Sequence, residues 1–263
     1  ARNVINSGSY SLTSHSYSNG ELAENGSAYN KNRQSRIVEN EHIYYYEYAS
    51  GIANSTYPQW SFPSALSPEM AYAIVNNAYE PTEDLINSYD PEKDLRIQEK
   101  QYFHTSITKP DGEILEFEIS PYVWFDEEAT FETAIAENAT PIYSYSNILL
   151  IGAEAIARSE GVTAEAVDLL AKVRERAYWN ENPETIRASL SGLSEEAFVE
   201  EVLKERIREL AFEFQIWFDV MRTRKFPVPS ENQPGQISFI DAVGATNNFG
   251  GVISETDLLM PIP

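Results

Sequence analysis

The segment Leu203–Arg222 constrains the fold of this chain more than any other part, because its charged and aromatic residues recur at helical spacing. On a helical period of about 3.6 residues, apolar side chains fall in one stripe, which consists of Leu203, Ile207, Leu210, Phe214 and Phe218. Neighbouring ridges carry ionic groups and one indole, namely Glu205, Arg206, Glu209, Glu213 and Trp217. The spacing therefore predicts one amphipathic helix over Leu203–Arg222.

The ionic groups of this helix have two interpretations, since a row of charges on a helix is usually a solvated face. Arg206 precedes Glu209 by three residues and Glu213 follows Glu209 by four, which brings these side chains close enough to share a cation. The aromatic residues interleaved with them favour ions that are paired inside a core. We therefore predict that Arg206, Glu209 and Glu213 form a structural ion network that does not touch a ligand.

The same segment resembles the signature helix of the SusD/RagB family, which comprises outer-membrane lipoproteins that capture glycans for a TonB-dependent transporter. The matching residues are the run Glu205–Glu213, the triplet Trp217–Asp219 and Arg222. The chain departs from the usual family form at two positions, with Phe214 in place of glycine and Ile216 in place of arginine.

Four further stretches resemble family motifs in the family order, and they are Ala1–Tyr10, Pro141–Ala155, Val173–Ala177 and Leu258–Pro263. Ser144 stands where the family commonly has arginine. The first stretch normally lies well inside the protein, so the resemblance implies that this chain is the C-terminal portion of a longer one. We expect the N-terminal half to carry the signal peptide, the lipidated cysteine and the first helical repeats.

Composition excludes several classes of function. The chain has 41 acidic and 19 basic residues and a formal net charge of -22, so a phosphate backbone would be repelled and no nucleic-acid partner is expected. The absence of cysteine excludes disulfides, thiolate metal sites and a cysteine nucleophile. No apolar run reaches the ~18 residues that a membrane-spanning helix requires.

Two regions differ in their sequence pattern. Residues 1–140 are rich in serine, asparagine, proline and tyrosine, with short strand-like runs at Glu41–Tyr48 and Ile114–Ile119. Long irregular segments of this kind are usually functional surfaces. We therefore expect residues 1–140 to complete the fold and to carry the ligand-binding surface.

Residues 141–263 have a helical pattern. One helix is predicted from about Tyr145 to Gly161, and a second begins after Thr163, which is a good N-cap residue. Small residues where the two helices cross resemble a tetratricopeptide unit. The expected fold is mainly α, with tetratricopeptide-like helical pairs packed against the loop-rich, partly β region in one structural domain. A single pair needs neighbouring repeats, which the missing N-terminal half would supply.

Candidate ligand-binding residues are sought among aromatic side chains, because sugars pack their apolar faces on exposed rings and bond amide or carboxyl groups through their hydroxyls. The loop Ile52–Phe62 is the first candidate, since proline stiffens it and it places Tyr57 and Trp60 beside Asn54 and Gln59. The alternative is a loop whose aromatic residues pack over the core.

Tyr122 and Trp124 are the second candidate, with the alternative that their strand-like alternation places them in the core. Trp179 and Trp217 lie at helix ends and are expected to pack inside.

Catalysis and metal binding have little support in the sequence. His15, His42 and His104 are far apart and lack ligand spacing, so we expect no metal and no cofactor. A glycoside hydrolase that uses paired carboxylates stays an alternative, as does a helical-repeat scaffold that binds protein. The resemblance implies instead a non-enzymatic, surface-exposed lipoprotein of the outer membrane of a Bacteroidetes-type bacterium. Its partners would be an oligosaccharide and a TonB-dependent outer-membrane transporter.

Overall fold

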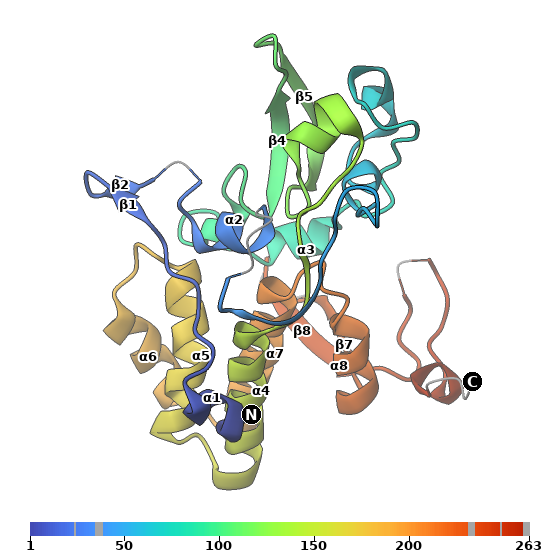
Figure 1. Ribbon diagram of the computed structural model, residues 1–263. Coiled ribbons are helices and arrows are strands. Elements are labelled where there is room, and N and C mark those ends of the chain that lie inside the picture. Colours follow the sequence, from blue (N-terminus) through green and yellow to red (C-terminus); the bar gives the residue numbers. More distant parts are fainter. Residues whose placement is uncertain (24, 35–38, 231–234, 248, 260–263) are drawn as a thin grey trace.

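The computed structural model describes residues 1–23, 25–34, 39–230, 235–247 and 249–259. A layer of helices occupies one end of the molecule, and loops with short strands occupy the other (Figure 1). The predicted mainly α fold is confirmed. Residues 260–263, which carry most of the last family-like stretch, lie outside the described ranges.

The helices are short except for three in the C-terminal half. They are α1 (Arg2–Ser7), α2 (Ala28–Arg33), α3 (Glu83–Asn87), α4 (Tyr145–Glu160), α5 (Ala164–Ala177), α6 (Pro183–Ser191), α7 (Glu195–Glu209) and α8 (Ile216–Thr223). Shorter helical segments of 3-10 or π type are η1 (Pro58–Trp60), η2 (Ser64–Glu69), η3 (Leu95–Ile97), η4 (Ala129–Thr133) and η5 (Glu255–Leu258).

The strands of the described ranges form antiparallel pairs and no larger sheet. The pairs are β1 (Tyr17–Ser18) with β2 (Glu21–Leu22), β3 (His42–Tyr46) with β6 (Thr140–Ser144), β4 (Phe103–Thr108) with β5 (Ile114–Pro121), and β7 (Lys225–Pro229) with β8 (Ile237–Asp241). Strands β3 and β5 confirm the two runs that the sequence pattern predicts.

The boundaries of the α4–α5 pair follow from local capping. Ser144 accepts a hydrogen bond from the backbone N–H of Asn147 and begins α4, while Gly161 ends it with φ 86°. Thr163 accepts a hydrogen bond from the backbone N–H of Ala166 and begins α5. The predicted stop at Gly161 and cap at Thr163 are therefore confirmed.

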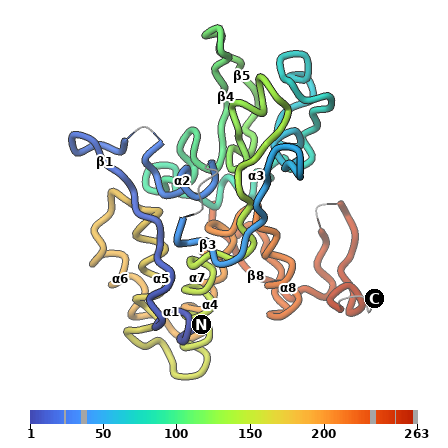
Figure 2. Tube along the Cα trace, in the orientation of Figure 1, coloured from blue at the N-terminus to red at the C-terminus, as the bar shows by residue number. Residues whose placement is uncertain are grey.

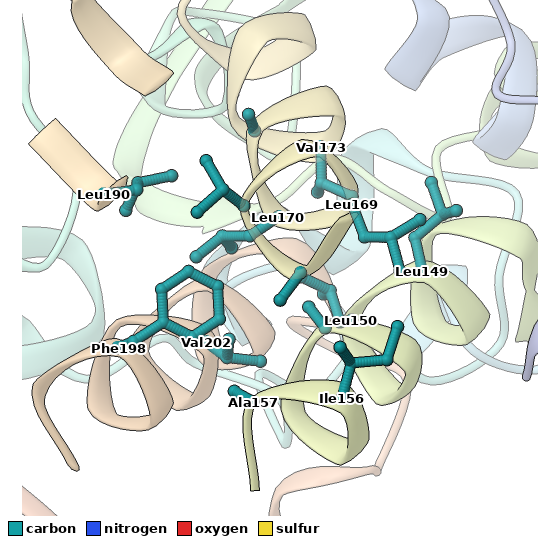
Figure 3. Close-up of a cluster of buried hydrophobic side chains, with 14 of the residues drawn as sticks. Leu149, Leu150, Ile156, Ala157, Leu169, Leu170, Val173, Leu190, Phe198 and Val202 are labelled. Carbon is teal, nitrogen blue, oxygen red and sulfur yellow. The ribbon is translucent and has the colours of Figure 1, made fainter. Parts of the chain in front are cut away.

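The main core of the helical half lies between α4, α5, α6 and α7, as Figure 3 shows for Leu150, Leu170 and Phe198. Gly152 permits close packing there, since a Cβ atom at this position would lie 3.0 Å from Leu169 Cδ1 and 3.2 Å from Ile5 Cδ1. Helix α1 thus packs against α4, and the N-terminal segment runs beside the helical layer (Figure 2).

The signature segment is not one helix, and the prediction of a continuous helix over Leu203–Arg222 is wrong. Helix α7 ends at Glu209, and the chain resumes helical geometry in α8 only at Ile216. Between them, Phe212 (φ 66°) and Phe214 (φ 58°) adopt left-handed backbone conformations. Two such residues interrupt the helical hydrogen bonds although the apolar period of the sequence continues.

This turn redirects the aromatic side chains that follow α7. Phe214 and Phe218 are exposed and do not continue the apolar stripe of α7. Trp217 is 40% exposed, so its expected place in the core is also wrong. Trp179, in contrast, is partly buried and packs against the second core cluster.

Candidate functional site

Four aromatic rings gather on the surface of the loop-rich half, and we call Tyr57, Trp60, Tyr79 and Phe214 the aromatic platform. Trp60 is 41% exposed and Phe214 50% exposed, while the two tyrosines are half-buried. The platform rests on the buried Trp124, whose ring stacks on Tyr57 with centroids 4.9 Å apart and an interplanar angle of 17°. Rings supported in this way present their outer faces with little conformational freedom.

A rigid turn holds the first two rings. Pro58 occupies the first turn of η1, where its fixed φ suits helical geometry. The backbone N–H of Trp60 donates to the carbonyl of Tyr57 (3.1 Å), and Ser61 Oγ donates to the same carbonyl (2.8 Å). The N–H of Tyr57 in turn donates to Ser55 Oγ at 3.3 Å.

A second segment brings Tyr79 to this turn. The N–H of Asn76 donates to the carbonyl of Gln59 (2.9 Å), and the N–H of Tyr79 donates to the carbonyl of Trp60 (3.3 Å). Ring centroids of Tyr79 and Trp60 are 6.5 Å apart. Sequence reasoning missed Tyr79, because these pairings join irregular segments whose sequences carry no periodic signal.

Amide side chains lie close in sequence to the residues of the platform. Gln59 is half-buried within the turn, and Asn54 is exposed in the segment that leads into it. Asn77, which is adjacent in sequence to the Tyr79 segment, has a buried Oδ1 atom with no hydrogen-bond partner among the described residues. The predicted group of Tyr57, Trp60 and Gln59 is therefore brought together by the structure.

The second candidate pair lies in the core. Trp124 is covered by Tyr57, Tyr79 and Phe212, and the indole offers no open face. Tyr122 is buried and stacks on Phe125 with centroids 5.1 Å apart. The expectation that Trp124 and Tyr122 contact a ligand directly is wrong, because both side chains are buried. Trp124 instead packs under the platform, against the inner face of Tyr57.

Glu213, between Phe212 and Phe214, forms a buried pair with Arg33. Apart from this pair, four acidic residues and four arginines form one connected buried ion network, namely Glu41, Asp94, Glu205, Glu209, Arg96, Arg174, Arg176 and Arg208. These residues come from both regions of the sequence. The network thus joins the loop-rich half to helices α5 and α7.

Arg96 lies at the centre of the network and is fully buried. Its guanidinium donates to both oxygens of Asp94 (2.7 and 2.9 Å), to Glu205 (2.8 Å) and to Glu209 (3.0 Å). Arg176 bridges the network in the other direction, from Glu209 to Glu41. Every charge named here has an opposite partner, as buried ions require.

The grouping predicted from helical spacing is only partly correct. Glu209 belongs to the network, but Glu213 pairs with Arg33 (2.5 Å) and shares no cation with Glu209 in the described ranges. Arg206 points elsewhere and donates to Asp219 (2.7 Å) and Asn147 (2.8 Å), so its inclusion is wrong.

The partners of Glu209 and Glu213 include cations outside the signature segment, and spacing within one helix could not reveal them.

The pKa values of these carboxyl groups reflect a balance between burial and neighbouring charge. At Glu41, burial raises the pKa, but Arg176 outweighs this effect and the pKa falls to about 2. At Glu205, burial acts in the same way, and its arginine partners hold the pKa well below the ordinary value. At Glu213, burial exceeds the effect of Arg33, and the pKa rises to about 7.

The histidines are placed apart in the fold. His15 Nε2 donates to the carbonyl of Arg176 (2.9 Å), while Nδ1 accepts from the N–H of Ala28 (3.0 Å). His104 is fully buried among aromatic rings, and neither ring nitrogen has a partner in the described ranges. Those ranges contain no group of three or more His, Cys, Asp or Glu that could hold a metal ion.

A groove of about 760 Å³ lies between α4 and α8. Its charged residues are Arg158, Arg206, Arg222, Glu154 and Asp219. These side chains mostly bond one another, and Arg222 donates to both oxygens of Glu154 at 2.8 and 2.7 Å.

Within the described part of the chain, no helix is both long enough and apolar enough to cross a bilayer.

Comparisons with known proteins agree on one family. The model of the SusD family matches residues 108–263. SusD-like protein P2 of Formosa agariphila is 34% identical over 80 residues, which is 30% of this chain and 16% of that protein.

Solved structures extend the match to the whole fold. A SusD superfamily protein from Parabacteroides distasonis superposes with a TM-score of 0.79 and 27% identity, over 100% of this chain and 52% of that one. Surface glycan-binding protein A from Bacteroides uniformis has the same fold, with a TM-score of 0.61 and 19% identity, over 98% of this chain and 50% of that one. The chain spans about half the length of these two solved proteins. It belongs to the SusD family.

Proposed function

We propose that this chain forms part of a protein that captures oligosaccharide without catalysis, and that the aromatic platform is the capture surface. The observation that carries the proposal is the exposure of Trp60, on a turn held by its own hydrogen bonds, together with the exposure of Phe214 in the same cluster of rings. Membership of the SusD family supports it. The fold shared with a surface glycan-binding protein is consistent with it.

The chemistry of the platform suits a sugar. Ring faces bind the C–H face of a pyranose, and the amides of Asn54, Gln59 and Asn76 are neutral groups that can both donate to and accept from hydroxyls. The platform is supported from below by Trp124, so its order does not depend on the ligand. Affinity is therefore not diminished by a large ordering cost on binding.

The buried carboxyl groups that pair with arginine are unsuited to glycoside hydrolysis. The pKa of Glu213, about 7, would suit a general acid. However, its side chain is buried and one oxygen is bonded to Arg33 at 2.5 Å, so a glycosidic oxygen cannot reach it. Glu205 and Glu209 are likewise buried and paired with arginine. The proposed function therefore includes no catalytic step.

The proposal extends to location and partners. Because the family comprises outer-membrane lipoproteins, we place this protein at the cell surface, where it delivers oligosaccharide to a TonB-dependent transporter. Residues 1–140 supply most of the capture surface, and residues 141–263 supply the supporting helices together with Phe214. The N-terminal half that relatives possess would complete the domain.

The test is a Trp60→Ala variant, assayed first on a glycan array and then by titration calorimetry with the oligosaccharide that binds. Loss of a ring that stacks on a ligand costs ~2 kcal/mol, so we expect about thirtyfold weaker binding at an unchanged melting temperature. Trp217→Ala is the matched control, because Trp217 is 40% exposed, against 41% for Trp60, and lies on α8. Unchanged affinity combined with a large loss of stability would show that Trp60 is structural.

A further inference from the structure

The segments that carry the aromatic platform contain no cationic side chain. Residues 39–92, which include Tyr57, Trp60 and Tyr79, have nine acidic residues and no lysine or arginine. Lysine and arginine are also absent from residues 110–157 and from residues 209–221, which carry Trp124 and Phe214. All rings of the platform thus lie on stretches of neutral or negative charge.

Building on the proposed function, we infer that the platform takes uncharged oligosaccharides and that Phe214 is one of the rings that bind them. Recognition of a carboxylate or sulfate on a sugar requires arginine, lysine or an equivalent donor array. An anionic sugar at this site would lose hydration without compensation from these segments, and the chain's net charge of -22 would repel it.

Two arginines linked to the turn that carries Phe214, by an ion pair or by position in the sequence, are already engaged. Arg33 pairs with Glu213, the residue immediately before Phe214, and it is buried. Arg208 is also buried and donates to Glu205 at 3.1 Å. Arg33 cannot turn toward a surface ligand without leaving the buried carboxylate of Glu213 without its cation, which is strongly unfavourable.

The backbone conformation of Phe214 is an independent observation. A bulky residue with φ 58° is a genuine outlier, and strained conformations of this kind gather at functional sites. Its ring is nearly parallel to Trp124 (15°, centroids 6.4 Å apart) and lies 5.9 Å from both Tyr57 and Tyr79. This backbone conformation thus accompanies an exposed ring that lies beside Tyr57 and Tyr79, at a position where the family form usually has glycine.

The experiment compares neutral sugars with their acidic counterparts. Linear hexasaccharides of glucose, mannose and galactose are titrated into the full chain, together with the same compounds oxidised to carboxylates at C6. We expect at least one neutral hexasaccharide to bind with an affinity that does not depend on salt. Its carboxylated form should bind at least about tenfold more weakly at low salt, with the difference narrowing as salt screens the repulsion.

Variants separate the two parts of the inference. Phe214→Gly should weaken the neutral ligand about tenfold without lowering the melting temperature, because glycine accepts the left-handed conformation. Phe249→Ala is the matched control, since Phe249 is 98% exposed on the loop between Thr246 and Val252 and has no ring contact among the described residues. Its affinity should equal that of the parent.

Each of three outcomes would refute a different claim. Equal binding of the neutral and carboxylated forms, with both lost in Trp60→Ala, refutes the uncharged class and retains the capture function. Parent affinity in Phe214→Gly refutes the role of that ring. Failure of every hexasaccharide to bind the parent refutes the proposed function itself.

Discussion

The Glu209→Ala variant tests whether the ion network stabilises the fold. Glu209 is buried and accepts hydrogen bonds from Arg96 Nη1 (3.0 Å) and from Arg176. Removing it leaves the network with one excess positive charge. Arg96 keeps Asp94 and Glu205, and Arg176 keeps Glu41, so each guanidinium is still paired.

The expected loss of stability follows from this arrangement. Breaking a buried ion pair by removing one partner typically costs about 3–5 kcal/mol. Because both arginines of Glu209 retain other carboxylates, we expect the lower end, about 3 kcal/mol. For a chain of this size, 1 kcal/mol corresponds to a shift of about 2–4 °C, so the melting temperature should fall by roughly 6–12 °C.

Differential scanning calorimetry at pH 7 measures the shift, and a glycan titration of the same sample measures binding. Glu160→Ala is the control, because Glu160 is also helical and also pairs with an arginine, Arg2, but is exposed to solvent. Its melting temperature should equal that of the parent. A Glu209→Ala protein that melts like the parent would refute the reasoning, and one that loses only binding would place Glu209 at the ligand.

Two further predictions concern buried titratable groups. His104→Phe should stabilise the protein by about 1–2 kcal/mol in a urea titration at pH 7, because the imidazole is buried without a described hydrogen-bond partner. Burial lowers the pKa of His104 from 6.5 to about 3, so the wild type should lose further stability relative to this variant as the pH falls below 6.5; parallel curves would contradict this. Burial raises the pKa of Glu213 from 4.5 to about 7, so between these pH values the folded state binds more protons than the unfolded state. Wild-type stability should therefore decline as the pH rises from 4.5 through 7. The melting temperature of Glu213→Gln relative to the wild type should therefore climb between pH 5 and pH 8, and a constant difference would argue against the raised pKa.

Local signals were sufficient to predict the helical pair. Gly161 and Thr163 end or cap these helices through hydrogen bonds to residues within four positions, so a short window of sequence contains the whole signal. The mainly α fold and the family follow from such windows taken together. The strand runs 41–48 and 114–119 were predictable for the same reason.

The features that sequence did not reveal depend on distant partners. Phe212 and Phe214 break a sequence that is helical by period, and the Glu213 between them pairs with Arg33, which is 180 residues away. Trp60 and Trp217 have nearly equal exposure, although the sequence context favoured a surface loop for Trp60 and the core for Trp217. Burial of a side chain is decided by which segments pack together, and a single sequence does not show this.

The long separations within the ion network have a consequence for the rate at which this protein folds. Glu205 and Glu209 contact Arg96 across 109 and 113 residues, and Arg176 contacts Glu41 across 135. Closing loops of that length is entropically costly, so these contacts form late, after local helices such as α4 and α5. Interactions that are absent from the transition state act mainly on the unfolding rate. We therefore expect the network to slow unfolding much more than it speeds folding.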